Sequence, residues 1–164
     1  MTHSFNTPWS VWYHSITDTS WTKSSYKHIY DIHNLYDLKG MQDTLQKHHL
    51  QNGMFFIMRD DIFPTWEDPD NREGCCVSFK VPGDTLRFEW NSLMIRVLGE
   101  SIHKDPDRHM EVTGLSIAPK KEFNIIKVWL RHVPETGDYT EWLQEYEPYF
   151  VKDKAIVKAH DLSY

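Results

Sequence analysis

The chain has 164 residues, of which 40% are hydrophobic, 14% aromatic and 26% charged. This length is typical of one compact domain, and the aromatic content excludes a largely disordered chain, because disordered sequences lack the apolar groups that offset the entropy of ordering. The formal net charge of -6 opposes the phosphate tracking that dominates non-specific nucleic-acid binding. We therefore expect a single domain over 1–164 that holds any nucleic acid locally.

The sequence also excludes membrane and disulfide-rich classes. No stretch approaches the roughly 20 apolar residues that span a bilayer, and residues 1–8 lack the basic and then apolar pattern of a secretory signal. The two cysteines, Cys75 and Cys76, are adjacent, and so close a pair forms a disulfide only with strain. These features predict a cytoplasmic protein with free thiols and no membrane partner.

Taken in chain order, the apolar residues predict seven strands and three helices. The predicted strands are 9–16, 26–32, 54–58, 75–81, 112–117, 125–131 and 155–160. Helices are predicted over 35–45, over 86–97 between an N-cap at Asp84 and a stop at Gly99, and over 139–147. Because strands and helices do not alternate regularly, we expect an α+β fold with a largely antiparallel sheet and helices on one face.

Seven tryptophans are unusual in so short a chain. Trp9, Trp12 and Trp90 lie on periodic apolar faces, which predicts core positions. Trp21 and Trp66 instead fall in polar segments that we interpret as loops. From the residues alone, a loop tryptophan that folds back over the core is somewhat commoner than one that stacks on a base, and both interpretations stay open at this point.

Five landmarks in order resemble the eukaryotic translation initiation factor 4E family over about His3 to His160. They are Trp9-x-x-Trp12, Trp21, Trp66-Glu67-Asp68, Leu98-Gly99-Glu100-Ser101 and Trp129. The resemblance implies a curved antiparallel sheet with three helices on its convex face. It also implies a non-enzymatic, monomeric protein without a cofactor, which binds the 7-methylguanosine cap of messenger RNA and promotes translation initiation. The compact length, without a long N-terminal tail, fits a divergent or virus-encoded member.

The same resemblance assigns the cap site. Trp21 and Trp66 would stack on the two faces of 7-methylguanine, a flat cation, each stack contributing about 1–3 kcal/mol and a desolvated cation-π contact about 2 kcal/mol. Glu67 would accept hydrogen bonds from the guanine edge, and Trp129 would pack near the methyl group. These terms are comparable with an association cost of about 4–15 kcal/mol, so phosphate contacts must add affinity.

At the phosphate path the chain departs from the family pattern. Cys76 and Ile125 stand where basic residues are expected, and Lys120 alone falls on a basic position. Lys121, and Lys127 on the same strand face as Trp129, are candidate substitutes. We therefore expect less dependence on the triphosphate, and more on the first transcribed nucleotide, than in the family.

The resemblance also implies a second partner, a scaffold or repressor peptide on the convex face. The expected contacts are His3 and Phe5 in the partner-facing segment 1–8, Tyr36 on the first helix and Ile95 on the second. This face is more polar than the family pattern, which predicts weak binding to ordinary partners or a dedicated partner.

Two alternative functions remain open. One is a cap-binding repressor of translation. The other is a nucleotide hydrolase in which the carboxylates of segment 60–71 hold Mg²⁺. No metal site is predicted, because the spacing fits neither a calcium loop nor a zinc site, and the ten histidines are expected on the surface.

Overall fold

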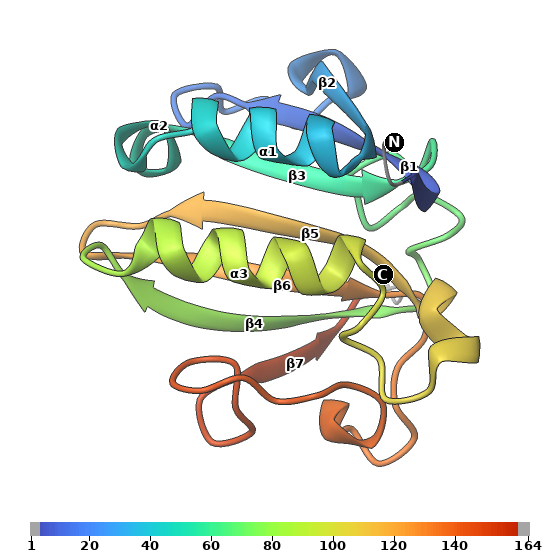
Figure 1. The fold of residues 1–164 in the computed structure, drawn as a ribbon. Coiled ribbons are helices and arrows are strands. Elements are labelled where there is room, and N and C mark those ends of the chain that lie inside the picture. Colours follow the sequence, from blue (N-terminus) through green and yellow to red (C-terminus); the bar gives the residue numbers. More distant parts are fainter. Residues whose placement is uncertain (1–3, 161–164) are drawn as a thin grey trace.

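The computed structural model describes residues 4–160. Its main element is one seven-stranded sheet in the order β2-β1-β3-β5-β6-β4-β7, and every neighbouring pair is antiparallel (Figure 1). The strands are β1 (Ser4–His14), β2 (Lys27–Asn34), β3 (Met54–Arg59), β4 (Cys75–Pro82), β5 (Val112–Pro119), β6 (Phe123–Leu130) and β7 (Ile156–Ala159). The predicted antiparallel α+β fold is therefore confirmed.

Three α-helices accompany the sheet: α1 (Leu35–Thr44), α2 (Lys47–Asn52) and α3 (Leu86–Leu98). Figure 1 shows α1 and α3 lying across one face of the sheet, running in opposite directions, with α2 at the edge beside α1. Gln42 of α1 donates to the Asn91 carbonyl of α3 over 3.1 Å, so the two long helices are in contact. Within residues 4–160, no helix is long and apolar enough to cross a bilayer.

Strand alternation separates the apolar residues into two clusters. The larger cluster packs between the sheet and the helices and includes Val77, Val128 and Trp90. The smaller one lies on the opposite face of the sheet and consists of Phe56, Met58, Ile62, Cys76 and Trp129. The sheet therefore has an apolar surface on the side without helices.

The tryptophans divide between these two faces. Trp9 and Trp90 are buried in the main core, as the sequence predicts. Trp12 is only partly buried, because it belongs to the opposite face, where its ring lies 5.0 Å from those of both His28 and Phe63. Trp142 packs against the main core at its periphery.

Two helix predictions were wrong. The N-cap of α3 is Thr85, not Asp84, because Asp84 lies inside a turn that the Thr85 N–H closes on the Pro82 carbonyl. Instead of a helix over 139–147 there is one 3-10 turn, Tyr139–Glu141. The segment after it donates and accepts backbone hydrogen bonds with Ile102 and Lys104, and those bonds replace the helical ones. The third helix is instead α2, which is too short for its periodicity to be seen in sequence.

A buried ion pair fastens the end of β3 to the segment after α3. Arg59 is fully buried, and its two terminal nitrogens donate to the two Glu100 carboxylate oxygens over 2.8 Å each. The same guanidinium donates to the carbonyls of Val112 and His109 and stacks 4.5 Å from the Trp9 ring. This network therefore gives Trp9 and Glu100, which belong to two of the sequence landmarks, a structural role.

We predict that Glu100→Ala lowers the free energy of unfolding by about 3–5 kcal/mol, because it leaves the Arg59 charge buried without its partner. Urea denaturation would measure the change. The matched control is Asp43→Ala, which removes an exposed pair with Lys39 and should cost at most about 1 kcal/mol. Equal effects of the two substitutions would contradict this role for Arg59 and Glu100.

Candidate functional site

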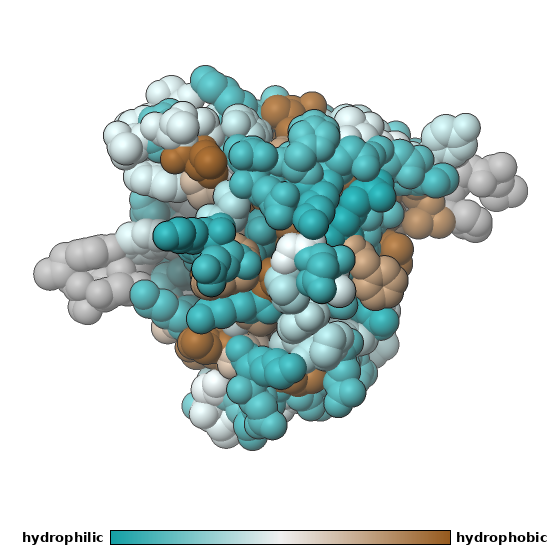
Figure 2. Space-filling model, turned by 90° about the vertical axis from the view of Figure 1, so that its left-hand side faces the viewer, coloured by the Kyte–Doolittle hydropathy of each residue, from teal (hydrophilic) through white to brown (hydrophobic). Residues whose placement is uncertain are grey.

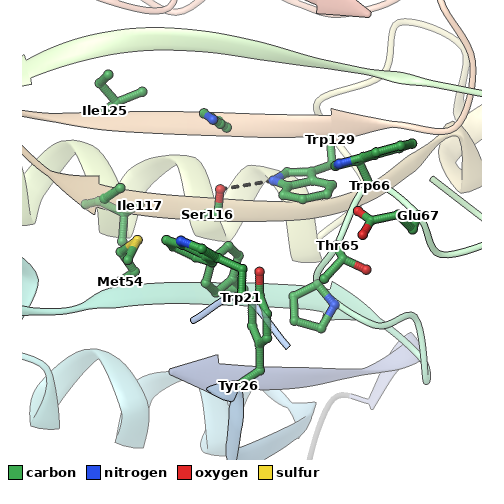
Figure 3. Close-up of a pocket in the computed structure, with 14 residues that line it drawn as sticks. Trp21, Tyr26, Met54, Thr65, Trp66, Glu67, Ser116, Ile117, Ile125 and Trp129 are labelled. Carbon is green, nitrogen blue, oxygen red and sulfur yellow. Dashed lines mark hydrogen bonds between the residues drawn. The ribbon is translucent and has the colours of Figure 1, made fainter. Parts of the chain in front are cut away.

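A cavity of about 330 Å³ opens on the face of the sheet that carries no helix. This volume lies at the lower end of the range of about 300–1,000 Å³ that small-molecule sites occupy. Figure 3 shows its lining, which comes from β3, β5, β6 and two loops. The four residues assigned to the base, Trp21, Trp66, Glu67 and Trp129, all line it.

Trp129 forms the rigid part of the cavity. It lies on β6 with only 6% of its surface exposed, and its indole nitrogen donates to the Ser116 hydroxyl over 3.0 Å (Figure 3). Because its polar atom is paired, the ring can present an apolar edge without an unsatisfied donor. The indole is thus fixed in place by neighbouring β5.

Trp21 is held by a residue that the sequence did not single out. Its ring is 56% exposed and stacks on the His14 imidazole, with centroids 4.0 Å apart and planes 9° apart. His14 is fully buried at the end of β1, contrary to the expected surface position, and its ring nitrogens lie within 3.0 Å of the Ser15 and Ser20 carbonyls. These contacts cover one face of the indole and leave the other toward the cavity.

The loop after β3 presents Trp66 on the other side of the cavity (Figure 3). Buried Asn71 donates from its side-chain amide to the carbonyls of Phe63 and Thr65, over 3.3 and 2.9 Å. The Asp68 carboxylate accepts from the backbone N–H groups of Phe63 and Asp70. The residues on both sides of Trp66 are therefore fixed by side chains of the same loop.

Glu67 is exposed, and Figure 3 shows its carboxylate beside Trp66, turned toward the cavity. Tyr26 lies across from it as another lining residue that the sequence did not indicate. Burial, together with the Glu67 charge, raises the pKa of Tyr26 to about 12, so this phenol stays neutral. The cavity therefore combines aromatic walls with one carboxylate.

Of the three lysines assigned to the phosphates, one lines the cavity and two do not. Lys127 lines the cavity between Ile125 and Trp129, as the strand spacing predicts. Lys120 and Lys121 do not line it, because they are exposed in the turn between β5 and β6. Figure 2 shows the edge of the molecule from which this turn and α2 project, and the surface at this edge is mostly hydrophilic.

The carboxylates of Asp68 and Asp70 have partners within the protein, and the thiols of Cys75 and Cys76 are buried. Asp68 orders its own loop, and Asp70 pairs with Arg131. Burial raises the pKa values of Cys75 and Cys76 to about 12, so both thiols are neutral at physiological pH, and both are free. Within residues 4–160, no group of three or more His, Cys, Asp or Glu side chains could hold a metal ion.

The residues assigned to a protein partner lie on the helix face. Tyr36 and Ile95 are 81% and 52% exposed, and the opposite directions of α1 and α3 put both near the same end of the layer (Figure 1). Phe5 is half-buried against the main core, because β1 already begins at Ser4. His3 lies outside the described residues.

Comparisons with known proteins agree with this fold. The family model described as "Eukaryotic initiation factor 4E" matches residues 4–148. Eukaryotic translation initiation factor 4E of Candida glabrata is 24% identical over 140 residues, which are 79% of this chain and 63% of that relative. The chain thus spans less than two thirds of the relative's length.

Solved structures in this family have the same fold. Ascaris suum eIF4E-3 in complex with m7G cap is 18% identical, with a TM-score of 0.72 over 82% of this chain and 77% of that one. A C. elegans eIF4E-3 complex with the 4E-binding protein Mextli and cap analog is 19% identical, with a TM-score of 0.73 over 86% and 80%.

We predict that Asn71→Ala destabilises the loop that carries Trp66. The substitution leaves the Phe63 and Thr65 carbonyls without their donor, which should cost about 1–3 kcal/mol. Hydrogen exchange should become faster at the amides of residues 65–71. The control Asn52→Ala removes an exposed amide that donates to the His48 carbonyl and should cost less than about 0.5 kcal/mol. Unchanged exchange in the loop would contradict the role given to Asn71.

Proposed function

The chain belongs to the eukaryotic initiation factor 4E family, and we propose that it binds the 7-methylguanosine cap of messenger RNA between Trp21 and Trp66. The observation that carries the proposal is the single cavity lined by both loop indoles, Glu67 and Trp129. A cap complex of a family member with the same fold supports the choice of ligand. In this proposal the single domain predicted over 1–164 is the cap-binding domain.

Charge makes the methylated base a better ligand than guanine. Methylation at N7 turns the purine into a cation, so an indole that stacks on it also gains a cation-π attraction. Trp21 offers one ring face, since His14 covers the other. Trp129 at the base of the cavity is the apolar surface for the methyl group. An unmethylated guanine would keep the stacking and lose the cationic part.

Glu67 supplies the recognition that stacking lacks. Every base has a π-face, so stacking alone is tolerant of base identity. A carboxylate can accept from both the N1–H and the exocyclic amine of guanine, in charge-assisted bonds worth about 1.5–3 kcal/mol each. Adenine has no such pair of donors on that edge, so Glu67 would select guanine.

We propose a binding protein that acts in translation initiation, not an enzyme. Asp68 and Asp70, the carboxylates next to the base reader, are already engaged with the loop backbone and Arg131. The described residues also hold no group of three or more His, Cys, Asp or Glu side chains placed to bind a metal ion, so the hydrolase alternative has less support than cap binding. Translation takes place in the cytoplasm, and the free thiols of Cys75 and Cys76 fit that reducing compartment.

We further propose that the helix face binds a peptide of a scaffold or repressor protein. The supporting observation is that Tyr36 of α1 and Ile95 of α3 are exposed near the same end of these two helices. A large aromatic on an exposed helix is the type of side chain that dominates binding energy at interfaces. A 4E-binding protein in the complex of the C. elegans relative supports a partner of this kind.

We predict that Trp21→Ala and Trp66→Ala each weaken binding of 7-methylguanosine triphosphate by about 1–3 kcal/mol, or roughly fivefold to a hundredfold. The loss follows from removing one wall of the base site. Isothermal titration calorimetry would measure it. Trp142→Phe, outside the cavity, is the control and should bind as the native chain does. Native affinity in either alanine variant would refute the sandwich.

Glu67→Gln serves as the complementary variant. It should weaken binding of both the methylated and the unmethylated nucleotide, because both share the guanine edge. Glu73→Gln, an exposed residue of the same loop, is its control.

We predict that Tyr36→Ala weakens binding of a 4E-binding helical peptide by about 1–2 kcal/mol, in line with the loss of an interface aromatic. Fluorescence anisotropy with a labelled peptide would measure it. Phe88→Ala removes another exposed aromatic of α3 and should leave the affinity unchanged. The opposite order of the two variants would move the partner site away from Tyr36.

A further inference from the structure

A second, larger cavity of about 570 Å³ opens where β4 ends and β6 begins. Lys80, Phe123 and Ile125 reach it from the face that carries the cap cavity, whereas Phe79 and Tyr149, which also line it, pack with the main core. Its lining includes the rings of Phe123 and Tyr149, the exposed side chain of Ile156, and two lysines, Lys80 and Lys154. Lys80 Nζ lies 4.8 Å from the Phe123 ring centroid, and Lys154 Nζ lies 5.5 Å from that of Tyr149. Aromatic surface and positive charge thus meet in one place.

The two cavities are joined by a continuous track of cross-strand neighbours. Ile125 lines both of them. On β6 the track runs from Trp129 to Phe123, and the residues opposite it on β4 run from Cys76 to Pro82. At about 3.3 Å per residue, Ile125 is about 13 Å and Phe123 about 20 Å from Trp129. An extended chain of ribose, triphosphate and second ribose covers such a span.

The track is positively charged although the chain is acidic. Lys127 stands opposite Ser78, and Lys158 stands opposite Cys76. On this face β4, β6 and β7 contribute Lys80, Lys127 and Lys158 and no carboxylate within their bounds. In sequence, the acidic residues that flank these strands are Glu73 and Asp84 around β4, Glu122 before β6, and Asp153 and Asp161 around β7. A local cluster of one sign attracts an oppositely charged ligand even where the net charge opposes it.

His160 adds aromatic surface to the start of this track, with its ring 5.7 Å from Trp129 and 6.4 Å from Trp66. Burial, and secondly the charge of Lys127, lower its pKa. The imidazole is therefore neutral at physiological pH, and the lysines carry the positive charge along the track.

We propose that the second cavity binds the nucleotide that follows the cap, with its base against Phe123 and Tyr149 and its phosphate near Lys80 and Lys154. This inference rests on the proposed cap binding and assigns residues to the next nucleotide. Single-stranded RNA is commonly held by aromatic rings that stack on bases beside lysines that contact phosphates. The proposed site also gives a physical reason why Cys76 and Ile125 need not be basic. Affinity that is lost at the triphosphate is regained at the nucleotide that follows it.

The test compares 7-methylguanosine triphosphate with the capped dinucleotide that carries adenosine after the triphosphate, both titrated by calorimetry. The native chain should bind the dinucleotide about tenfold more tightly, as one added base stack implies. Phe123→Ala should abolish this gain and keep the affinity for the mononucleotide. Phe88→Ala, on the helix face, should retain the whole gain.

A second variant tests the proposed contact between Lys80 and the phosphate separately from the stacking on Phe123. Lys80→Ala should reduce the slope of log affinity against log salt for the dinucleotide by about 0.7, the value for one phosphate contact in a single strand. An unchanged slope would overturn the assignment of Lys80.

The remaining outcomes separate this inference from cap binding itself. Equal native affinities for the two ligands would overturn the inference and leave the cap site standing. Retention of the gain in Phe123→Ala would also overturn it and leave the cavity to another occupant, such as an apolar peptide. Absence of any binding to 7-methylguanosine triphosphate would refute the proposed function first.

Discussion

Alternation along β6 is the constraint on which both faces of the molecule depend. Val128 and Ile126 point into the core beneath the helices, and Trp129, Lys127 and Ile125 therefore point the other way. A shift of one residue in the pairing with β4 and β5 would exchange the two sets. The hydrophobic core thus fixes the register, and the register places an indole, a lysine and an apolar residue in line on the surface that carries the site.

The two loop tryptophans are fixed by different means, and this difference matters for binding. Trp21 rests on a buried imidazole at the end of a strand, whereas Trp66 depends on hydrogen bonds made by Asn71 and Asp68 within its loop. Walls that are ordered before the ligand arrives reduce the entropy lost on binding. Both indoles are therefore held in place by neighbouring residues of the protein.

The sequence was sufficient for the elements with strong periodicity and for residues on a recognisable motif. All seven strands appear, and Trp21, Trp66, Glu67 and Trp129 meet in one cavity. It could not indicate His14 or Asn71, because their roles come from contacts with residues distant in the chain or from the path of a loop. The segment 139–147 misled because its backbone partners lie near residue 103, which helical spacing cannot reveal. The sequence analysis did not single out Phe123, which precedes the predicted strand 125–131 and gains its neighbours from β4 and the segment 149–154.

The central claim is that two indoles enclose a purine because methylation has made it a cation. Its most direct test is intrinsic tryptophan fluorescence of the native chain, titrated in parallel with 7-methylguanosine triphosphate and with guanosine triphosphate. We expect saturable quenching by the methylated nucleotide and at least about tenfold weaker quenching by the other, which lacks the cation-π contribution. Equal quenching by both nucleotides, or none by either, would contradict the account.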